Sequence, residues 1–412
     1  MSKRNKNSEP EKINIPDKPE RINEFVIRRV DGKNHEPEYY LKNQNYDVYL
    51  VLNVYDYFIW NLLDGSNAID IINKKFYKEF NRFSIEYVKK KLELFCTRGF
   101  INNYADFNPK TLNKRIKFLQ FRFPVKKIDV LFNLLYKIIG KYLFSRIFKI
   151  FFTIICITGL IAFYFIRDKA VHFIFDKTLI NVIVAYAAFL LPVIIHEFSH
   201  ALACIHYGCE VKEAGIMIYL CFPVFYVNTS DSWMVRRKAR IIISLAGIIA
   251  DLFVCCLLSL MYFFFPGAYY APLIYQVIFI GFVRILLNLN PLLAWDGYYV
   301  LMDLLNIHNL RSQAFNFLKS TLFSKIRKKE SFSLTDWKLL IYAIASVIYM
   351  GYFILLNRLT HLYELIFINH FNGIKLFDII SIFFMAQLLF FIIYKPFQAI
   401  KNLVTRKKRS AK

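Results

Sequence analysis

Apolar segments of nearly membrane-spanning length recur along the last two thirds of the chain, and they restrict its possible folds more than any other feature. A helix needs roughly 20 apolar residues to cross the hydrocarbon core of a bilayer. Six segments approach that length: 150–166, 179–205, 241–265, 272–289, 339–356 and 376–394. Hydrophobic residues make up 57% of the chain, whereas soluble domains contain roughly 45–50%. The pattern predicts a multispanning α-helical membrane protein with about six transmembrane helices, in a domain over residues 150–395.

Basic residues give the chain a formal net charge of +24, and they gather in alternate loops. If the N-terminus lies inside, then loops 207–240 and 290–338 and the basic tail 396–412 lie inside too, while the opposite loops carry few Lys or Arg. The positive-inside rule describes this distribution, so no nucleic-acid partner is expected. The Lys-, Asn- and Ile-rich composition is typical of an AT-rich bacterial genome. We predict a multi-pass protein of the bacterial cytoplasmic membrane, in contact with the lipid bilayer, with both termini cytoplasmic.

The residues before the first apolar segment are predicted to lie in the cytoplasm. Residues 1–23 are polar and contain three prolines, which indicates a disordered leader. Residues 24–105 are predicted to form a small α+β, winged-helix-like domain, which a basic linker over 106–149 joins to the membrane part. Two strand-like runs and three helical patterns make up the domain: 39–41, 48–52, 55–63, 68–80 and 84–99.

The sequence His196-Glu197-Phe198-Ser199-His200 lies inside the second apolar segment. On a helix, two histidines at positions i and i+4 lie on one face, where both imidazoles reach a single Zn²⁺. The glutamate lies beside the metal-bound water and is suited to act as general base. Ionisable residues are costly to bury in a membrane and are therefore candidates for function. The motif predicts a zinc-dependent metallopeptidase with metal ligands His196 and His200 and catalytic Glu197.

A catalytic zinc usually has a third protein ligand, and the chain offers two candidates. His206 has the spacing of the HExxHxxGxxH proteases, but Ala203 stands where those proteases have the glycine that turns the chain. Asp296 lies in a Pro- and Gly-containing stretch after the fourth apolar segment, where irregular backbone has to be buried in protein or line a wet cavity. An aspartate there needs a cationic partner, which zinc would provide. We favour Asp296, and His206 remains the alternative.

Together these motifs resemble those of the site-2-protease class of intramembrane zinc metalloproteases. The resemblance covers about residues 178–310. Within the class, the chain resembles more specifically the bacterial branch known as peptide zinc metalloproteases. Four stretches carry it: 201–208, 230–233, 244–247 and 290–299. In that class two histidines and an aspartate bind zinc and a glutamate activates water. The resemblance therefore implies these roles for His196, His200, Asp296 and Glu197.

The N-terminal domain resembles the PqqD-like peptide-recognition domains that accompany enzymes of ribosomal peptide maturation. The resemblance rests on Tyr40-Leu41 and on the stretches 62–65 and 99–101. It implies that a leader peptide adds as a strand to the edge of a sheet. The alternative is a cytoplasmic domain for assembly or regulation.

Residues 213–229 are apolar but contain Gly215 and Pro223 within a β-like run. They predict a membrane-associated strand or a re-entrant segment rather than a further spanning helix. In the resembling class such a segment holds the substrate extended beside the zinc.

Several other polar residues in the membrane part are open to two interpretations. Asp251 and Arg284 could form a structural pair, or Asp251 could support the metal site, and we favour the structural role. Asn290 could donate a hydrogen bond to a developing oxyanion or cap the end of a helix. The seven cysteines form no CxxC pair and are expected to be reduced, buried thiols.

These observations predict an intramembrane zinc endopeptidase that hydrolyses a peptide bond of a membrane-associated or ribosomally synthesised precursor peptide. The alternative is a transport or export component for a modified peptide, with a metal site that is not catalytic. The intact Glu197 favours the peptidase, because a protein without this activity has no use for a base between two metal ligands.

Overall fold

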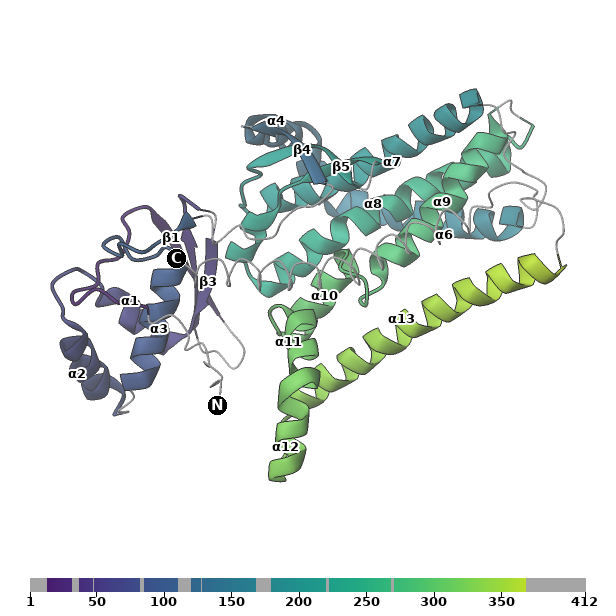
Figure 1. Ribbon diagram of the computed structural model, residues 1–412. Helices are drawn as coiled ribbons and strands as arrows, with labels where there is room; N and C mark the ends of the chain where they lie inside the picture. Colours follow the sequence, from purple (N-terminus) through teal and green to yellow (C-terminus); the bar gives the residue numbers. More distant parts are fainter. Residues whose placement is uncertain are drawn as a thin grey trace. The chain divides into compact units, whose positions relative to one another are not determined.

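The computed structural model describes residues 13–31, 37–46, 48–81, 85–109, 120–126, 128–167, 179–219, 222–267 and 270–367. The chain divides into two compact units, Met1–His308 and Asn309–Lys412. The first unit contains two small sheets and most of the long helices (Figure 1). The sixth segment predicted to span, 376–394, and the tail 396–412 lie outside the described residues.

A three-stranded antiparallel sheet begins the first unit, with its strands in sequence order. The strands are β1 (Phe25–Asp31), β2 (Pro37–Asn43) and β3 (Val48–Leu52). β2 extends the predicted run 39–41, and β3 coincides with the predicted run 48–52. β1 is an additional strand, which the pattern does not reveal because Arg28 and Arg29 interrupt its apolar residues. Leu41 of β2 lies opposite Ile27 and Leu50, so these apolar side chains share one face.

The two faces of this sheet pack against different parts of the protein. The face with Leu41 covers a core shared with helices α1 (Val54–Asn61), α2 (Ile69–Phe80) and α3 (Ile85–Thr97). Trp60 and Phe95 are among the largest side chains in this core, and burial of each such side chain contributes roughly 1.5–3 kcal/mol. On the opposite face, Tyr40 packs with Met234, far along the chain.

The end of the expected leader belongs to this domain. Ile22 is part of the core, and Ile13 and Ile15 pack against it. The backbone amide of Arg21 donates to the Leu63 carbonyl at 3.0 Å, and that of Ile22 donates to the Phe100 carbonyl at 3.1 Å. Residues 13–22 are therefore ordered, which corrects the expectation of a disordered leader for this part. Residues 1–12 lie outside the described residues.

Five described helices are long and apolar enough to cross a membrane. They correspond to five of the six predicted segments: α6 (Arg146–Ile166), α7 (Leu179–His206), α8 (Arg237–Phe264), α9 (Ala271–Leu289) and α13 (Leu334–Phe367). Within the first unit, α8 packs against α6, α7 and α9 (Figure 1). Their outward surface is apolar: Ile147 is 82% exposed and Leu286 is 69% exposed. These are the features of a multi-pass membrane protein.

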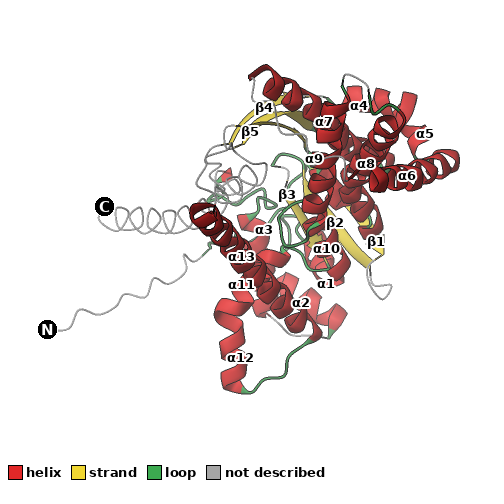
Figure 2. Cartoon of the chain, turned by 90° about the vertical axis from the view of Figure 1, so that its right-hand side faces the viewer, coloured by secondary structure: helices red, strands yellow, loops and turns green. Residues whose placement is uncertain are grey.

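A second antiparallel sheet joins the predicted linker to the segment between α7 and α8. β4 (Gln120–Lys126) pairs with β5 (Glu213–Tyr219), which pairs with β6 (Phe222–Val227). Figure 2 shows both sheets in yellow among the helices. The segment 213–229 therefore contains strands, one of the two predicted alternatives. The linker prediction is corrected, because 106–149 contains β4 and the helix α4 (Asp129–Leu135).

The second unit begins with the short helices α11 (Leu310–Asn316) and α12 (Leu322–Lys328), which precede α13. Asp336 lies in the first turn of α13, where a negative charge is favourable. Its carboxylate accepts hydrogen bonds from Lys325 Nζ at 2.6 Å and from the Ser333 hydroxyl at 2.8 Å. These contacts tie the start of α13 to α12.

Candidate metal centre

The two histidines of the HExxH motif lie one turn apart on α7, as the helical spacing predicts. His196 is 7% exposed and His200 is 8% exposed. Their Nε2 atoms are 3.2 Å apart. Both imidazoles are therefore directed at one point inside the helical region.

Asp296 brings a carboxylate to the same point from another helix. Its Oδ2 lies 3.2 Å from His196 Nε2 and 3.5 Å from His200 Nε2. Asp296 begins the short helix α10 (Asp296–Leu305) after a turn that ends α9. Asn290 precedes Pro291 in this turn and is extended, because a residue before proline disfavours the helical conformation. The Asn290 Oδ1 accepts a hydrogen bond from the Leu292 amide at 2.9 Å, so this side chain caps the turn.

Gly297 allows the turn to pass close to the end of α9. A Cβ atom at this position would lie 2.8 Å from the Asn288 carbonyl oxygen and still closer to that of Leu289. A larger residue would push Asp296 away from the histidines.

The outer nitrogens of both imidazoles have hydrogen-bond acceptors. His196 Nδ1 lies 2.8 Å from Asp251 Oδ2, and His200 Nδ1 lies 2.7 Å from the carbonyl oxygen of Ile243. An acceptor at Nδ1 assigns the proton to that nitrogen and leaves the Nε2 lone pair free for a metal. Asp251 also forms an ion pair with Arg284 and is 1% exposed. Asp251 therefore makes both of the contacts that the sequence presented as alternatives.

Gly247 leaves space for the two imidazoles. A Cβ atom on Gly247 would lie 2.6 Å from His196 Nε2 and still closer to His200 Nε2. Gly247 lies on α8, which packs against the motif helix α7. The sequence places it only within the stretch 244–247, and no local pattern indicates that it faces the motif. Its role was therefore missed.

The donor set fits a zinc ion. The ligand atoms of His196, His200 and Asp296 all lie within 4.8 Å of one another, so one ion could contact all three. Two imidazole nitrogens and one carboxylate oxygen are common ligands of catalytic zinc. Asp296 would bind such an ion as a carboxylate, because metal ligands have to be deprotonated.

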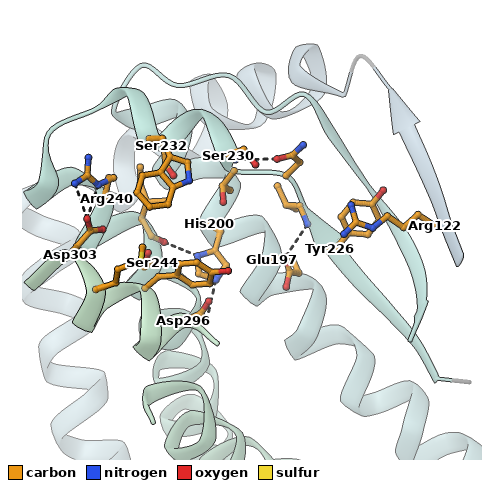
Figure 3. A pocket seen from close by; sticks show the side chains of 17 residues that line it. Arg122, Glu197, His200, Tyr226, Ser230, Ser232, Arg240, Ser244, Asp296 and Asp303 are labelled. Atoms are coloured by element: carbon orange, nitrogen blue, oxygen red, sulfur yellow. Dashed lines mark hydrogen bonds and ion pairs between the residues drawn. The ribbon is translucent and has the colours of Figure 1, made fainter. Parts of the chain in front are cut away.

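Glu197 lies beside this group and opens onto a cavity of 440 Å³ (Figure 3). Its Oε2 accepts a hydrogen bond from the Val227 amide, the last residue of β6, at 3.0 Å. The cavity is also lined by His200 and Asp296. The glutamate is thus held by backbone beside the potential metal ligands and the open space.

The remaining wall of the cavity includes several polar and charged side chains (Figure 3). Arg240 is 3% exposed and bonds to Asp303 through two nitrogens, each at 2.8 Å. Burial raises the pKa of Asp303 above its usual value, although Arg240 opposes this effect. On the sheet side, Arg122 lies over the ring of Tyr226 at 5.1 Å. The cavity therefore has ordered polar groups on several sides.

His206, the alternative third ligand, lies elsewhere. Its Nδ1 is 2.7 Å from the Tyr136 hydroxyl, and its ring stacks on Phe144 with 3.9 Å between the ring centres. Among the described residues, the group of potential ligands contains His196, His200 and Asp296 and does not include His206. The structure thus brings together the three residues that the sequence favours.

A curated protein is similar to part of the chain: the "Putative peptide zinc metalloprotease protein YydH" of Bacillus subtilis (strain 168). The two are 26% identical over 127 residues, which are 31% of this chain and 48% of that protein. The chain thus spans about half the length of this relative. No family model matches the chain, and no solved structure matches it. The similarity suggests a hydrolase related to zinc metalloproteases.

Proposed function

We propose that the protein is an intramembrane zinc endopeptidase of the site-2-protease type. It hydrolyses a peptide bond of a membrane-associated or ribosomally synthesised precursor peptide in the bacterial cytoplasmic membrane. The observation that carries this proposal is the convergence of Asp296 of α10 with His196 and His200 beside Glu197 on α7, a helix of spanning length. Isolated ionisable groups are costly in such a region, and a bound cation offsets that cost.

In this proposal His196, His200 and Asp296 hold the zinc. When bound, zinc lowers the pKa of a coordinated water towards ~7 and polarises a carbonyl group. The Glu197 carboxylate takes the proton of the attacking water and later delivers it to the departing amine. The Val227 amide holds Glu197 Oε2, so that the other carboxylate oxygen remains for this transfer. Asp251 and the Ile243 carbonyl keep the histidine rings oriented.

The strand β6 ends at Val227, whose amide binds Glu197. A strand beside the catalytic glutamate supports a substrate bound in extended form. An extended peptide exposes the bond that a helix conceals, and an edge strand can pair with it. The charged loops support an orientation with both termini in the cytoplasm. By its resemblance to PqqD-like domains, the N-terminal domain binds the leader of a precursor peptide.

The second candidate function is transport or export of a modified peptide, with a metal that is only structural. Helices of spanning length and a cavity suit this function equally well. The position of Glu197 at the cavity favours the peptidase, because a structural zinc site needs no base.

The first test is the zinc content of the detergent-purified protein. We expect one zinc per chain in the wild type and in Glu197→Gln, and loss or strong weakening in Asp296→Ala. Glu210→Gln is the matched control, because its side chain is 69% exposed and lies outside the ligand group. A wild type without metal, or an Asp296→Ala variant that binds zinc normally, would refute the ligand assignment.

The second test separates the two functions. Candidate precursor peptides are incubated with the zinc-loaded wild type and with Glu197→Gln, and the products are identified by mass spectrometry. Loss of a general base typically costs on the order of 10²–10⁴ in rate. Cleavage by the wild type with little or none by Glu197→Gln supports the peptidase, whereas equal behaviour of the two supports transport.

A further inference from the structure

The N-terminal sheet meets the rest of the first unit through the face that carries Tyr40 and Lys42. These residues are two positions apart on β2 and therefore point to the same side, opposite to Leu41 in the domain core. Tyr40 is 3% exposed and Lys42 is 5% exposed, although neither belongs to that core. A lysine on the surface of an isolated domain would be solvated, so its burial identifies this face as a contact surface.

Lys42 forms a buried ion pair with Asp231, which is 189 positions away along the chain. Asp231 is 4% exposed, and its other carboxylate oxygen accepts a hydrogen bond from the Glu210 amide at 3.1 Å. The Lys42 Nζ also lies 3.9 Å from Glu210 Oε2. Breaking one side of a buried ion pair leaves an uncompensated charge, so the two partners hold each other in place.

Asp231 belongs to a short segment that forms part of the cavity wall. The segment is the 3₁₀-helix Ser230–Met234, which is preceded by Thr229 without a side-chain cap. Ser230, Ser232 and Trp233 line the cavity together with Glu197 and His200. Five residues of 3₁₀-helix have few internal hydrogen bonds, so the position of this wall depends on outside contacts. Asp231 is the member of the segment that Lys42 holds.

A second contact from the same strand supports the same wall. The guanidinium of Arg240 lies 5.4 Å from the ring centre of Tyr40 and 5.5 Å from that of Trp233. Arg240 is itself fixed by its two bonds to Asp303. Two side chains of β2 therefore contact the residues around the cavity: Lys42 binds Asp231, and Tyr40 lies against Arg240.

We propose that Lys42 is a positioning residue, through which the N-terminal domain sets the position of the cavity wall 230–234. This inference rests on the proposed function, in which the cavity receives the peptide. Lys42 does not touch the metal ligands or Glu197; it acts through Asp231. Without it the zinc site remains complete, while the wall beside it moves and binds substrate less well. The N-terminal domain is then a part of the substrate site.

Hydrogen exchange in the full-length protein, measured by mass spectrometry, tests the contact without any substrate. In Lys42→Met we expect the amides of 228–236 to exchange at least about tenfold faster than in the wild type, because their support is lost. The control Lys91→Met removes a different ion pair of the same domain, that of Lys91 with Asp56 at 2.8 Å. It should leave exchange in 228–236 unchanged. Equal exchange in Lys42→Met and the wild type would overturn the proposal.

A second variant guards against a general folding defect. Asp231→Asn keeps an oxygen that can accept from the Glu210 amide but removes the charge that pairs with Lys42. We expect it to accelerate exchange in 228–236 while amides 88–96 of α3 stay protected. The double variant should then resemble the single variants, because both act through one contact. Additive effects, or loss of protection in α3 by both single variants, would overturn the proposal.

Zinc content and kinetics complete the test. Lys42→Met should retain the zinc of the wild type, with KM raised about tenfold and kcat changed far less, because the wall binds substrate and takes no part in proton transfer. A fall in kcat with an unchanged KM would contradict a positioning role. If the wild type itself lacks zinc or cleavage, the proposed function fails, but the exchange measurement still decides whether Lys42 holds the wall.

Discussion

The N-terminal domain and the helical region over 146–305 differ in what they expose to their surroundings. The domain encloses apolar residues such as Leu41, Trp60 and Phe95, as a protein in water does. The helical region exposes many large apolar residues to its surroundings, and beside apolar side chains it encloses polar ones, among them Asp251 at 1% and Ser259 at 0% exposure. In the first region the hydrophobic effect forms the core. In the second the lipid is as apolar as the side chains, so close packing and polar contacts hold the helices together.

This difference determines what a substitution does in each region. A small change at the polar centre of the helices should abolish zinc binding without unfolding the protein. A change in the core of the N-terminal domain should reduce stability without affecting zinc. Two results would contradict this comparison: loss of zinc from a variant in the core of the N-terminal domain, or unfolding of a variant at the polar centre of the helices.

The largest effect is expected from Gly247→Ala. The added methyl group would occupy the space of the two imidazole Nε2 atoms, so we expect zinc binding to be lost. Zinc content of the purified protein measures this. Gly267→Ala is the control, because a Cβ atom there meets nothing within 4 Å. Normal zinc binding by Gly247→Ala would show that the site has more room than the structure indicates.

The next effect concerns stability. Leu92 is fully buried in the N-terminal core, so Leu92→Ala should destabilise that domain by about 2–5 kcal/mol. Leu286→Ala makes the same chemical change at a side chain that is 69% exposed on α9, and it should have little effect. Exchange of the α3 amides measures the first loss. Equal destabilisation by the two variants would contradict the division between the regions.

An intermediate effect is expected from Asp251→Asn. Asparagine can still accept a hydrogen bond from His196 Nδ1, but it removes the negative charge that strengthens this bond and pairs with Arg284. Loss of such a support typically weakens metal binding about 10–100-fold. Competition with a zinc chelator gives the affinity, and Glu330→Gln, a half-exposed carboxylate of the second unit, is the control. An unchanged affinity would show that the charge of Asp251 does not act on the metal site.

The smallest effect concerns a carboxylate in the water-facing domain. Hydrogen bonds from the Ser66 hydroxyl and amide lower the pKa of Asp64 to about 2. The unfolded value is about 3.9, so this carboxylate stabilises the fold above about pH 4 and the contribution is lost as the pH falls through about 2. Between pH 5 and pH 2 the Tm of the isolated domain should fall more than that of its Asp64→Asn variant. Ser66→Ala should lie between them, and parallel curves would refute the assignment.

Much of the fold and of the site follows from local patterns. The spanning helices follow from runs of apolar residues, and the proximity of His196 and His200 follows from the geometry of one helix. Asp296 was identified because an acid in an irregular stretch needs a cation. The strands β1 and β4 were missed because Arg residues and, in β4, a proline interrupt their patterns. β4 in particular pairs with β5 across more than 80 positions.

The sequence by itself predicted the multi-pass class, five of the described helices of spanning length and the candidate ligands His196, His200 and Asp296, because each prediction depends on residue types within a few positions. Tertiary structure alone decided that Gly247 faces the imidazoles, that Asp251 supports His196 while pairing with Arg284, and that Lys42 reaches Asp231. Each of these contacts joins distant positions, and packing of helices and sheets selects them. The spacing of residues along the chain does not indicate which distant residues will be in contact.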